Sequence, residues 1–562
     1  MRRLSILALA LTTTLPGIGA SQGSAGAADT TARVVDRLFD EWRGTDRPGC
    51  AVGVSRDGRV VYEQGYGMAN LETGTPIRPW SIFQVGSTSK QFTAMAIMLL
   101  VRDGKLSLDD NIRRYLPEIP DYGTPITIRH LLTHTSGLRD YDFLFSLRQS
   151  QADLVTDTTI LRILSRQRAL NFTPGTEWSY SNSGFMLLGL IVARVSGHSL
   201  REFADERMFR PLGMANTHFH DQEGMLTPGR TTGYLRTQAG WRVFMANETT
   251  VGGTGLFTTV GDMLKWEANL DHPLVGDRAL VDQMEAQARL TNGDTINYGF
   301  GLGIGRYRGA RGVGHGGTTF GYQADERRFP EQGLAVAVEC NTRNVDTQAL
   351  VRRIADAYLG GALGPVETEV PPQPVPVAAA VLASRVGIYV QPTTLEFVDV
   401  SMRDGELTYN LNRRVDRPMV PVAEHRFRVT DEGEQYELVF ADGERAGFER
   451  QTLRAGRPFG HPLPFEWRQP VLMRSSALAE YEGEYYSEEL DTRWRVTASD
   501  SGLSLHRQWE DRSRSYRALF SDTFFGGGGL IQFTRSGRQV TGIEVTIPSV
   551  RRVRFARVPA GR

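Results

Sequence analysis

A proline-rich stretch at residues 364–379 divides this 562-residue chain into two parts with different sequence patterns. Before the stretch, segments with helical periodicity alternate with short apolar runs that are typical of strands. After it, short strand-like runs are separated by turn residues. Because a proline-rich spacer is extended, we predict that residues 364–379 are a linker between separate folding units. A chain of this length is also expected to hold two to four domains.

The first part is predicted to form an α+β domain over residues 28–363. Short strands come early, helices follow, and strands return at the end, which favours one antiparallel sheet built from both ends of the domain and flanked by helices. The expected elements are helices at 34–42, 88–103 and 183–196, a hairpin of 51–55 with 59–62, and strands at 313–319, 322–329 and 334–340.

The second part carries a weak internal repeat with an offset near 96 residues. Residues 386–389 resemble 481–485, and residues 436–440 resemble 530–533. The repeat predicts two small all-β, barrel-like domains, at residues 380–470 and 471–562. One continuous β-sandwich is the alternative.

The composition limits the classes of partner. Hydrophobic residues make up 40% of the chain and charged residues 23%, as in soluble globular proteins. The formal net charge is zero and the pI is near 7.2, so no basic field favours nucleic acid or a membrane surface. We expect a small molecule or short peptide as the partner, and the sequence does not indicate an oligomeric state.

Residues 1–27 are predicted to be a secretory signal peptide. A basic start, Met1–Arg3, precedes a largely apolar run, and Ala25–Ala27 offers a cleavage site with small residues. Residues 18–20 are a second, poorer site, and an ordinary apolar N-terminus is the alternative. The expectation is an exported protein, periplasmic or secreted, with no membrane-spanning segment once the signal is removed.

Export would allow the two cysteines, Cys50 and Cys340, to pair. Each lies at the end of an apolar strand-like run, so two buried free thiols are equally compatible with the pattern. Neither arrangement would make the chain a disulfide-dependent scaffold.

Lysine is rare in this chain, and one of the few lysines lies next to a candidate nucleophile. Only Lys90, Lys105 and Lys265 occur among 64 basic residues, and the others are Arg. Lys90 follows Ser87 by three residues, so the two side chains share a helix face. A desolvated Lys can release its proton and act on a neighbouring hydroxyl, which Arg cannot do. Ser87 is therefore a candidate nucleophile with Lys90 as its proton acceptor, although an ordinary exposed Lys90 would fit the spacing as well.

Two further motifs follow in order, Tyr180-Ser181-Asn182 and His315-Gly316-Gly317-Thr318. Together with Ser87-x-x-Lys90 they resemble the penicillin-recognising serine hydrolases, a superfamily of class C β-lactamases, D-peptidases and esterases. The resemblance covers about residues 31–345 and implies a β-lactamase/transpeptidase-like fold. The two C-terminal all-β domains make the layout most similar to that of serine D-aminopeptidases.

The resemblance implies a hydrolysis that proceeds through an acyl-enzyme on Ser87. By this analogy the backbone N–H groups of Ser87 and Thr318 form the oxyanion hole. Tyr180 is a second candidate base, which requires that Lys90 or a protonated His315 lower its pKa from about 10. The Asn182 amide would bind a substrate carbonyl and Lys90.

Other roles remain open for three of these residues, and the glycines of the third motif could act through their backbone. Tyr180 could be a buried structural residue, Asn182 a helix N-cap, and His315 a turn residue. Gly316 and Gly317 have no side chains to keep a substrate away from the strand, so their backbone could pair with it.

The third motif departs from the β-lactamase pattern, because His315 stands where most of those enzymes have Lys. A permanent cation for a substrate carboxylate is lost with it. His at this position is typical of the D-aminopeptidases and some esterases of the superfamily. We therefore expect an amidase or peptidase acting on D-amino-acid amides or peptides. The alternatives are a short-chain esterase, a weak β-lactamase, and a penicillin-binding or peptidoglycan-sensing protein without turnover.

In aminopeptidase relatives a loop of the last β domain enters the cleft. Residues 521–529 are the candidate here, because four glycines allow close approach and Phe524 and Phe525 supply an apolar tip. A flexible hairpin turn is the alternative.

We expect no metal and no cofactor. His130 and His134 lack the carboxylate of a metalloprotease pattern, and structural histidines near the cleft are the favoured interpretation. The run from His218 to Asp221 is more typical of a polar loop than of a zinc site.

Overall fold

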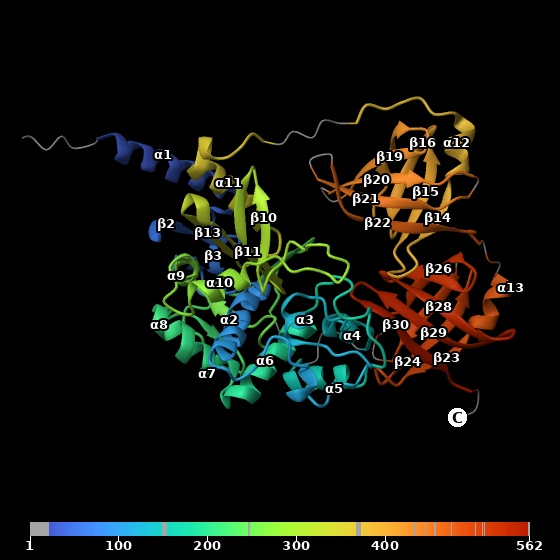
Figure 1. Cartoon of the computed structure of the whole chain (residues 1–562), viewed down its shortest axis with the longest axis horizontal. Coiled ribbons are helices and arrows are strands. Elements are labelled where there is room, and N and C mark those ends of the chain that lie inside the picture. The colour runs from blue at the N-terminus through green and yellow to red at the C-terminus, as the bar shows by residue number, and fades with distance from the viewer. Residues whose placement is uncertain are drawn as a thin grey trace, which may run out of the picture.

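The computed structural model describes residues 22–559 apart from 149–153, 246–247, 367–371, 432–433, 444, 455–456, 472, 474, 501, 509 and 511. A region of helices around one sheet occupies the left of Figure 1, and two further sheets, in yellow-orange and red, occupy the right. The α+β class and the all-β character of the C-terminal half are thereby confirmed. The exact domain boundaries stay predictions.

The first region is built on a six-stranded antiparallel sheet with the order β10-β11-β12-β13-β1-β2. Two strands come from the start of the region and four from its end, and the sequence predicts all of them except β10. Asp57 and Gly58 have φ values of 50° and 71°, which suits the two-residue turn of the β1–β2 hairpin. The strands are β1 (Cys50–Arg56), β2 (Arg59–Tyr66), β10 (Gly303–Tyr307), β11 (Ala310–Thr319), β12 (Tyr322–Phe329) and β13 (Leu334–Cys340).

Side-chain size differs between the two faces of this sheet. Val52 and Val54 point to the face covered by the helices α1 and α11, while Ala51 and Gly53 point to the opposite face. A Cβ at Gly53 would lie 3.0 Å from Leu264 Cδ1 of α9, so small residues let that helix approach closely. The helices are α1 (Gln22–Leu38), α2 (Ser89–Arg102), α3 (Ile128–Leu132), α4 (Tyr141–Arg148), α5 (Asp157–Ser165), α6 (Asn182–Ser196), α7 (Leu200–Ala204), α8 (Arg210–Leu212), α9 (Val260–Asp271), α10 (Arg278–Met284) and α11 (Thr347–Leu359).

The predicted helix at 34–42 differs from the observed one. Helix α1 begins at Gln22 and ends at Leu38, and a 3-10 turn follows at Asp40–Trp42. The apolar residues Val35, Phe39 and Trp42 nevertheless pack together against the sheet, so the predicted buried face is correct. The pattern of apolar residues specifies that face better than it specifies the helix ends.

Three short sheets complete the first region. The strand β9 (Leu256–Thr258) lies between β5 (Phe83–Gln84) and β6 (His218–Phe219), and two hairpins are formed by β3 (Met68–Asn70) with β4 (Thr75–Pro76) and by β7 (Tyr234–Thr237) with β8 (Gly240–Val243). The β5–β9 pairing brings the chain before Ser87 next to residues 256–258.

Cys50 and Cys340 form a disulfide across the β1–β13 pair, at directly opposed positions of the ladder. The bond joins the strands that come first and last in the chain order of this sheet, across 290 residues. Of the two arrangements that the sequence left open, the structure has the paired one.

The C-terminal half forms two separate sheets, so it is not one sandwich. The first has nine strands in the order β17-β16-β15-β14-β22-β21-β20-β19-β18. Its two edge strands, β17 (Arg417–Pro418) and β18 (Val420–Ala423), are separated in the sequence only by Met419, so the sheet must curl back on itself. The other strands are β14 (Gly387–Val390), β15 (Phe397–Arg403), β16 (Glu406–Leu411), β19 (Arg426–Asp431), β20 (Glu434–Phe440), β21 (Phe448–Arg454) and β22 (Arg457–Arg468), preceded by α12 (Ala379–Ser384).

The second sheet is a closed eight-stranded barrel. After α13 (Ser475–Leu478), its strands are β23 (Gly483–Ser487), β24 (Thr492–Ser499), β25 (Gly502–Arg507), β26 (Arg514–Phe520), β27 (Thr523–Gly526), β28 (Gly529–Ser536), β29 (Gln539–Ile547) and β30 (Val550–Arg557). The weak repeat has a structural counterpart at its start. Tyr389 donates to the carbonyl of Arg385 at 2.8 Å, and Tyr485 donates to the carbonyl of Tyr481 at 2.7 Å.

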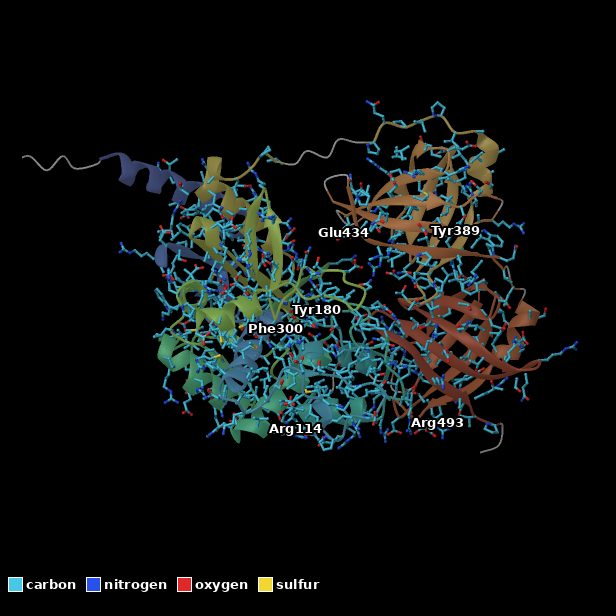
Figure 2. All side chains as sticks on the ribbon, in the orientation of Figure 1. Arg114, Tyr180, Phe300, Tyr389, Glu434 and Arg493 are labelled. Carbon is cyan, nitrogen blue, oxygen red and sulfur yellow. A yellow bond between two sulfur atoms is a disulfide. The ribbon has the colours of Figure 1, made fainter. Side chains whose placement is uncertain are left out.

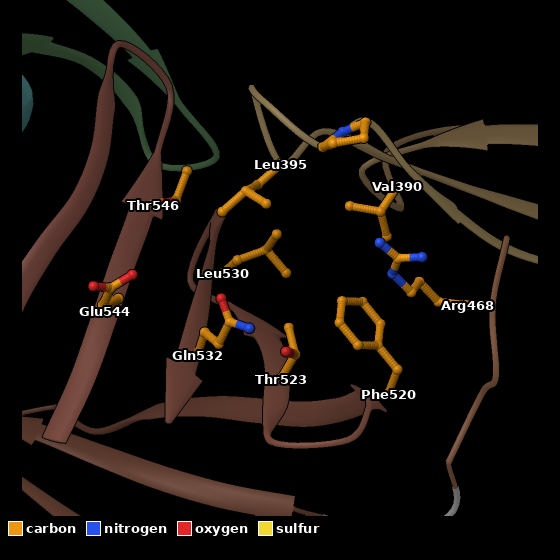
Figure 3. Close-up of a pocket in the computed structure, with 10 residues that line it drawn as sticks. Val390, Leu395, Arg468, Phe520, Thr523, Leu530, Gln532, Glu544 and Thr546 are labelled. Carbon is orange, nitrogen blue, oxygen red and sulfur yellow. The ribbon is translucent and has the colours of Figure 1, made fainter. Parts of the chain in front are cut away.

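The barrel packs against the helical region beside α4 and α5 (Figure 1). Thr492 of β24 donates to the carbonyl of Arg148 at 3.3 Å, and the Arg507 guanidinium donates to the carbonyl of Ser146. A cavity of about 130 Å³ lies where the barrel meets the nine-stranded sheet, between Leu395, Arg468 and Phe520 (Figure 3). None of the predicted site residues lines this cavity.

Among the described residues no single helix is long and apolar enough to cross a membrane, and the pair Asn182–Ser196 with Leu200–Leu212 passes such a test only across a bend of 78°.

Candidate active site

Ser87 lies in a 3-10 turn, Gly86–Thr88, which leads directly into α2. Two glycines let strand β11 approach this turn. A Cβ at Gly317 would lie 1.8 Å from the carbonyl oxygen of Val85, and one at Gly86 would lie 3.0 Å from the backbone N of Thr318. The segments that carry the predicted oxyanion donors, Ser87 N and Thr318 N, are therefore packed backbone to backbone.

Lys90 lies one turn after Ser87 and is fully buried. Its ammonium donates to Ser87 Oγ at 3.0 Å, to Asn182 Oδ1 at 2.7 Å and to the carbonyl of Gly253 at 2.7 Å. All three donors of the ammonium are thus used. The structure brings Ser87, Lys90 and Asn182 together although 92 residues separate Lys90 from Asn182.

The same burial changes the basicity of Lys90. Desolvation lowers the pKa of Lys90 to about 7, and the carboxylates of Asp140 and Asp142 oppose this shift. Near neutral pH a large fraction of Lys90 is therefore uncharged and can accept the proton of Ser87. This is the condition that a lysine base requires.

Asn182 is held by two carboxylates. Its backbone N–H donates to Asp140 Oδ2 at 2.5 Å, and its side-chain Nδ2 donates to Asp142 Oδ2 at 2.7 Å. Asn182 is the first residue of α6, and Ser181 has the N-cap position without a side-chain cap bond. The alternative of Asn182 as the helix cap is wrong, because the Asp140 carboxylate binds the free N–H at this helix end.

Tyr180 lies beside Lys90, with the Lys90 Nζ 4.8 Å from the centre of its ring. Burial raises the pKa of Tyr180, although the nearby Ser87 hydroxyl acts in the opposite direction. The expectation that a neighbouring cation would lower this pKa is therefore wrong, because burial, followed by the negative charges of Asp140 and Asp142, raises it. The Tyr180 hydroxyl is buried and forms no hydrogen bond of ordinary geometry, so it remains available for a substrate or leaving group. Figure 2 shows Tyr180 in the middle of the molecule.

His315 is neutral in this site. Its Nε2 is 2.9 Å from the hydroxyl of Tyr298. Burial, followed by the charge of Lys90, lowers the pKa of His315 to about 3. His315 therefore supplies no positive charge at neutral pH, neither to Tyr180 nor to a substrate carboxylate.

His134 and His130 have structural contacts near the site. His134 is buried, its Nδ1 accepts from the backbone N of Ser181 at 3.2 Å, and its ring lies 4.3 Å from that of Tyr180. His130 Nδ1 accepts from the backbone N of Thr127 in a capping box at the start of α3. Across the described ranges, no group of three His, Cys, Asp or Glu residues is arranged to hold a metal ion.

Phe524 and Phe525 do not lie on a cleft loop. Both belong to strand β27: Phe524 is buried in the barrel core against Tyr481, and Phe525 packs on Phe397 of the nine-stranded sheet at 5.0 Å between ring centres. The alternation along a strand directs the two rings to opposite sides of the barrel wall. The glycines after them form the β27–β28 turn.

A different turn of the barrel contacts the site. Ser549, between β29 and β30, has a φ of 57°, and its carbonyl accepts from the backbone N of Asp140 at 3.1 Å and from Asn171 Nδ2 at 2.9 Å. Its hydroxyl donates to the carbonyl of Tyr180 at 3.3 Å. The barrel thus contacts the backbone of Asp140, whose carboxyl binds Asn182, and the backbone of Tyr180 in the second motif.

The sequence analysis missed the roles of Asp140, Asp142, Tyr298 and Ser549. Asp140 and Asp142 lie between the first and second motifs in the sequence, and neither motif includes them. Nothing local to Tyr298 or Ser549 indicates a site residue, because their partners are distant in sequence.

Residues 35–359 match the family described as Beta-lactamase. A D-aminopeptidase from Gluconobacter oxydans is 30% identical over 315 residues, which are 56% of this chain and 59% of the relative. Penicillin-binding protein 4* from Bacillus subtilis is 32% identical over 263 residues, which are 43% of this chain and 57% of the relative. The chain therefore spans about six tenths of the length of these curated relatives.

Two solved structures have the same fold at low sequence identity. The octameric penicillin-binding protein homologue from Pyrococcus abyssi has a TM-score of 0.53 and 24% identity, covering 79% of this chain and all of that one. SurE with D-Leu has a TM-score of 0.54 and 23% identity, again over 79% of this chain. Since the family match covers more than half of the sequence, this chain belongs to the beta-lactamase family.

Proposed function

We propose that this protein is a serine hydrolase that cleaves amides or short peptides of D-amino acids carrying a free α-ammonium group, with Ser87 as the nucleophile and Lys90 as the base. The D-aminopeptidase relatives support the substrate class. Asn182, Thr318 and the strand backbone at Gly316 and Gly317 are assigned to substrate and oxyanion binding.

The charge of the site carries this proposal. His315 is neutral, so it offers no fixed cation for the carboxylate that penicillins and peptides ending in D-Ala-D-Ala present. Asp142, which accepts from Asn182 at 2.7 Å, lies near two other acidic groups, and burial together with Asp140 and Glu248 raises the pKa of Asp142 well above its usual range. An incoming ammonium group favours the ionised form of these acidic side chains, whereas a substrate carboxylate disfavours it. The substrate that fits is one with its amine, and not its acid, near the scissile bond.

The reaction follows from the contacts of Lys90. Neutral Lys90 accepts the proton of Ser87, and Ser87 Oγ forms a bond to the carbonyl carbon of the substrate. The amide C–N bond then breaks, and Lys90 or Tyr180 returns a proton to the leaving amine. Water hydrolyses the resulting ester and restores Ser87. The N–H groups of Ser87 and Thr318 would stabilise each oxyanion, at about 3 kcal/mol for each donor.

The first test is turnover of D-alanine p-nitroanilide, with the L-isomer and Ser87→Ala as controls. We expect cleavage of the D-anilide that is lost in Ser87→Ala, which removes the nucleophile and leaves the fold intact. Equal cleavage of both isomers would contradict the D-specificity. Turnover of esters or nitrocefin without any anilide cleavage would instead favour the esterase or the β-lactamase.

A second test examines the ammonium group. N-acetylation of the D-alanine anilide should raise KM sharply in the wild type, because the charge that Asp142 attracts is lost. In Asp142→Asn the two anilides should differ much less. A wild-type enzyme that prefers the acetylated substrate would refute the assignment of Asp142, even if the D-specificity stands. A stable acyl-enzyme with penicillin, detected by intact mass and without product, would favour a penicillin-binding protein without turnover.

We also propose that the chain is exported. A signal peptide at residues 1–27 would direct export, and the Cys50–Cys340 disulfide is of the kind that persists in oxidising compartments. Fractionation of the native host, with the N-terminus of the mature protein determined by mass spectrometry, tests this. Recovery of the protein in the cytoplasm with an intact N-terminus would contradict it.

A further inference from the structure

Glu326 on β12 is a buried acidic residue that the reaction itself does not use. Its side chain lies behind the turn that carries Ser87, and only 2% of the residue is exposed. Glu326 is paired with His315 in the β11–β12 ladder, and it contacts the nucleophile's helix through Thr88 and Gln91. It therefore connects the three parts of the site that must keep their relative positions: the turn, α2 and β11.

The donors and acceptors along this connection form one directed chain. Trp266 Nε1, which can only donate, donates to Gln91 Oε1 at 2.6 Å. This orients the Gln91 amide so that its Nε2 donates to Glu326 Oε1 at 2.5 Å. Oε1 of Glu326 is therefore an acceptor, and any proton on this carboxyl belongs to Oε2.

Thr88 decides whether such a proton is present. Its Oγ1 lies 2.9 Å from Glu326 Oε2 and 3.1 Å from the carbonyl of His315. A hydroxyl has one proton, and the His315 carbonyl can only accept. If Glu326 were ionised, one of these two contacts would have no proton. If Glu326 Oε2 carries a proton, it donates to Thr88 Oγ1, and Thr88 donates to His315, so every polar atom is satisfied.

We propose that Glu326 is a protonated carboxylic acid that positions Ser87, by fastening the turn that carries it to α2 and to the strand that carries His315 and Thr318. Glu326 is a positioning residue and touches no substrate. Its effect is on the acylation step, because the geometry between Ser87 and the oxyanion donors depends on the turn and the strand together.

The groups that face Glu326 agree with a neutral carboxyl. Burial, followed by the negative charges of Glu267 of α9 and Asp325 of β12, raises the pKa of Glu326 well above its usual range. The nearby guanidinium of Arg328 is engaged by Glu267, Asp271 and Glu285, so it does not pair with Glu326. An ionised Glu326 would lie among carboxyl groups without a cation of its own.

Matched substitutions separate the protonated form from the ionised one. Glu326→Gln keeps a donor toward Thr88 and an acceptor toward Gln91, so it should acylate at the wild-type rate. Glu326→Leu removes both contacts of the carboxyl. Thr88→Val removes the contact of Thr88 with Glu326 and its bond to the His315 carbonyl, while Thr88→Ser retains both. We expect Glu326→Leu and Thr88→Val to lose about 10- to 100-fold in the acylation rate, with Thr88→Ser unaffected. The rate is read from the pre-steady-state burst with p-nitrophenyl acetate, so the result does not depend on D-specificity.

Infrared spectroscopy gives a readout that packing alone would not change. The difference spectrum of wild type minus Glu326→Gln at pH 7 should contain the carbonyl band of a protonated carboxylic acid. A carboxylate band in its place would overturn the proposal, as would a Glu326→Gln variant as slow as Glu326→Leu. If Glu326→Leu fails to fold, Thr88→Val decides: a wild-type acylation rate in that variant overturns the positioning role, and a loss that Thr88→Ser does not share supports it.

Discussion

Arg139 and Glu489 form a buried ion pair at 2.5 Å between the helical region and the barrel, although 350 residues separate them in the sequence. Their side chains are only 1% and 4% exposed. Arg139 also donates to the carbonyls of Arg551 and Arg552, both at 3.0 Å. Since Asp140 follows Arg139 and binds Asn182, this pair connects the barrel directly to the active site.

Glu489→Ala should therefore destabilise the protein and impair catalysis together. Removal of one partner leaves the Arg139 charge buried without its counter-ion, which costs about 3–5 kcal/mol. Chemical denaturation followed by tryptophan fluorescence measures the loss. The control is Glu484→Ala, which breaks an exposed pair with Arg495 and should cost under about 1 kcal/mol. Equal midpoints for the two variants would contradict the role of the buried pair.

Lys90→Arg should abolish most of the activity although it keeps the positive charge. Arg cannot release a proton to become the base, and proton transfer of this kind contributes about 10²- to 10⁴-fold. The measurement is kcat/KM on the D-alanine anilide. Lys105→Arg, at an exposed position, is the matched control and should behave as the wild type. Near-normal turnover by Lys90→Arg would exclude Lys90 as the base.

The activity should rise with pH through about 7. Lys90 acts as a base only when it is uncharged, and its pKa in the folded protein is about 7, so kcat/KM is low below that pH and reaches a plateau above it. Because Asp142 stabilises the charged form of Lys90, Asp142→Asn should lower that pKa and move the rising limb to lower pH. Asp121→Asn, which changes an exposed carboxylate, should not move it. If the rising limb of the pH profile stays at the same pH in Asp142→Asn, a group other than Lys90 controls the activity.

Loss of the disulfide should lower stability without changing the site. Cys50 and Cys340 close a loop of 290 residues, and a disulfide typically contributes about 2–4 kcal/mol. The double variant Cys50→Ala, Cys340→Ala should unfold at lower urea concentration than the oxidised wild type. Reductant should lower the midpoint of the wild type and leave that of the double variant unchanged. Identical midpoints for oxidised and reduced wild type would contradict this contribution.

Local patterns in the sequence determined much of this protein. The hairpin at Asp57-Gly58, the helices α2 and α6, and strands β11 to β13 are where periodicity and turn residues predict them, because these depend on neighbours a few positions away. The order of the three motifs also identified the family, since each motif is short and contiguous. The proximity of Ser87 to Lys90 could likewise be predicted from the sequence, because one helical turn separates them.

Tertiary structure alone decided the parts that depend on distant residues. Burial sets the pKa of Lys90, Tyr180 and His315, and no local pattern reveals that Tyr180 is raised while Lys90 is lowered. The sequence indicated that Phe524 and Phe525 of the barrel contact the active site. In the structure, Ser549 in the β29–β30 turn contacts Asp140 instead. Composition identifies glycine-rich turns. The orientation of the closed barrel against α4 and α5 decides which of its turns contacts the active site. That orientation is fixed by buried contacts such as Arg139 with Glu489, whose partners lie hundreds of residues apart.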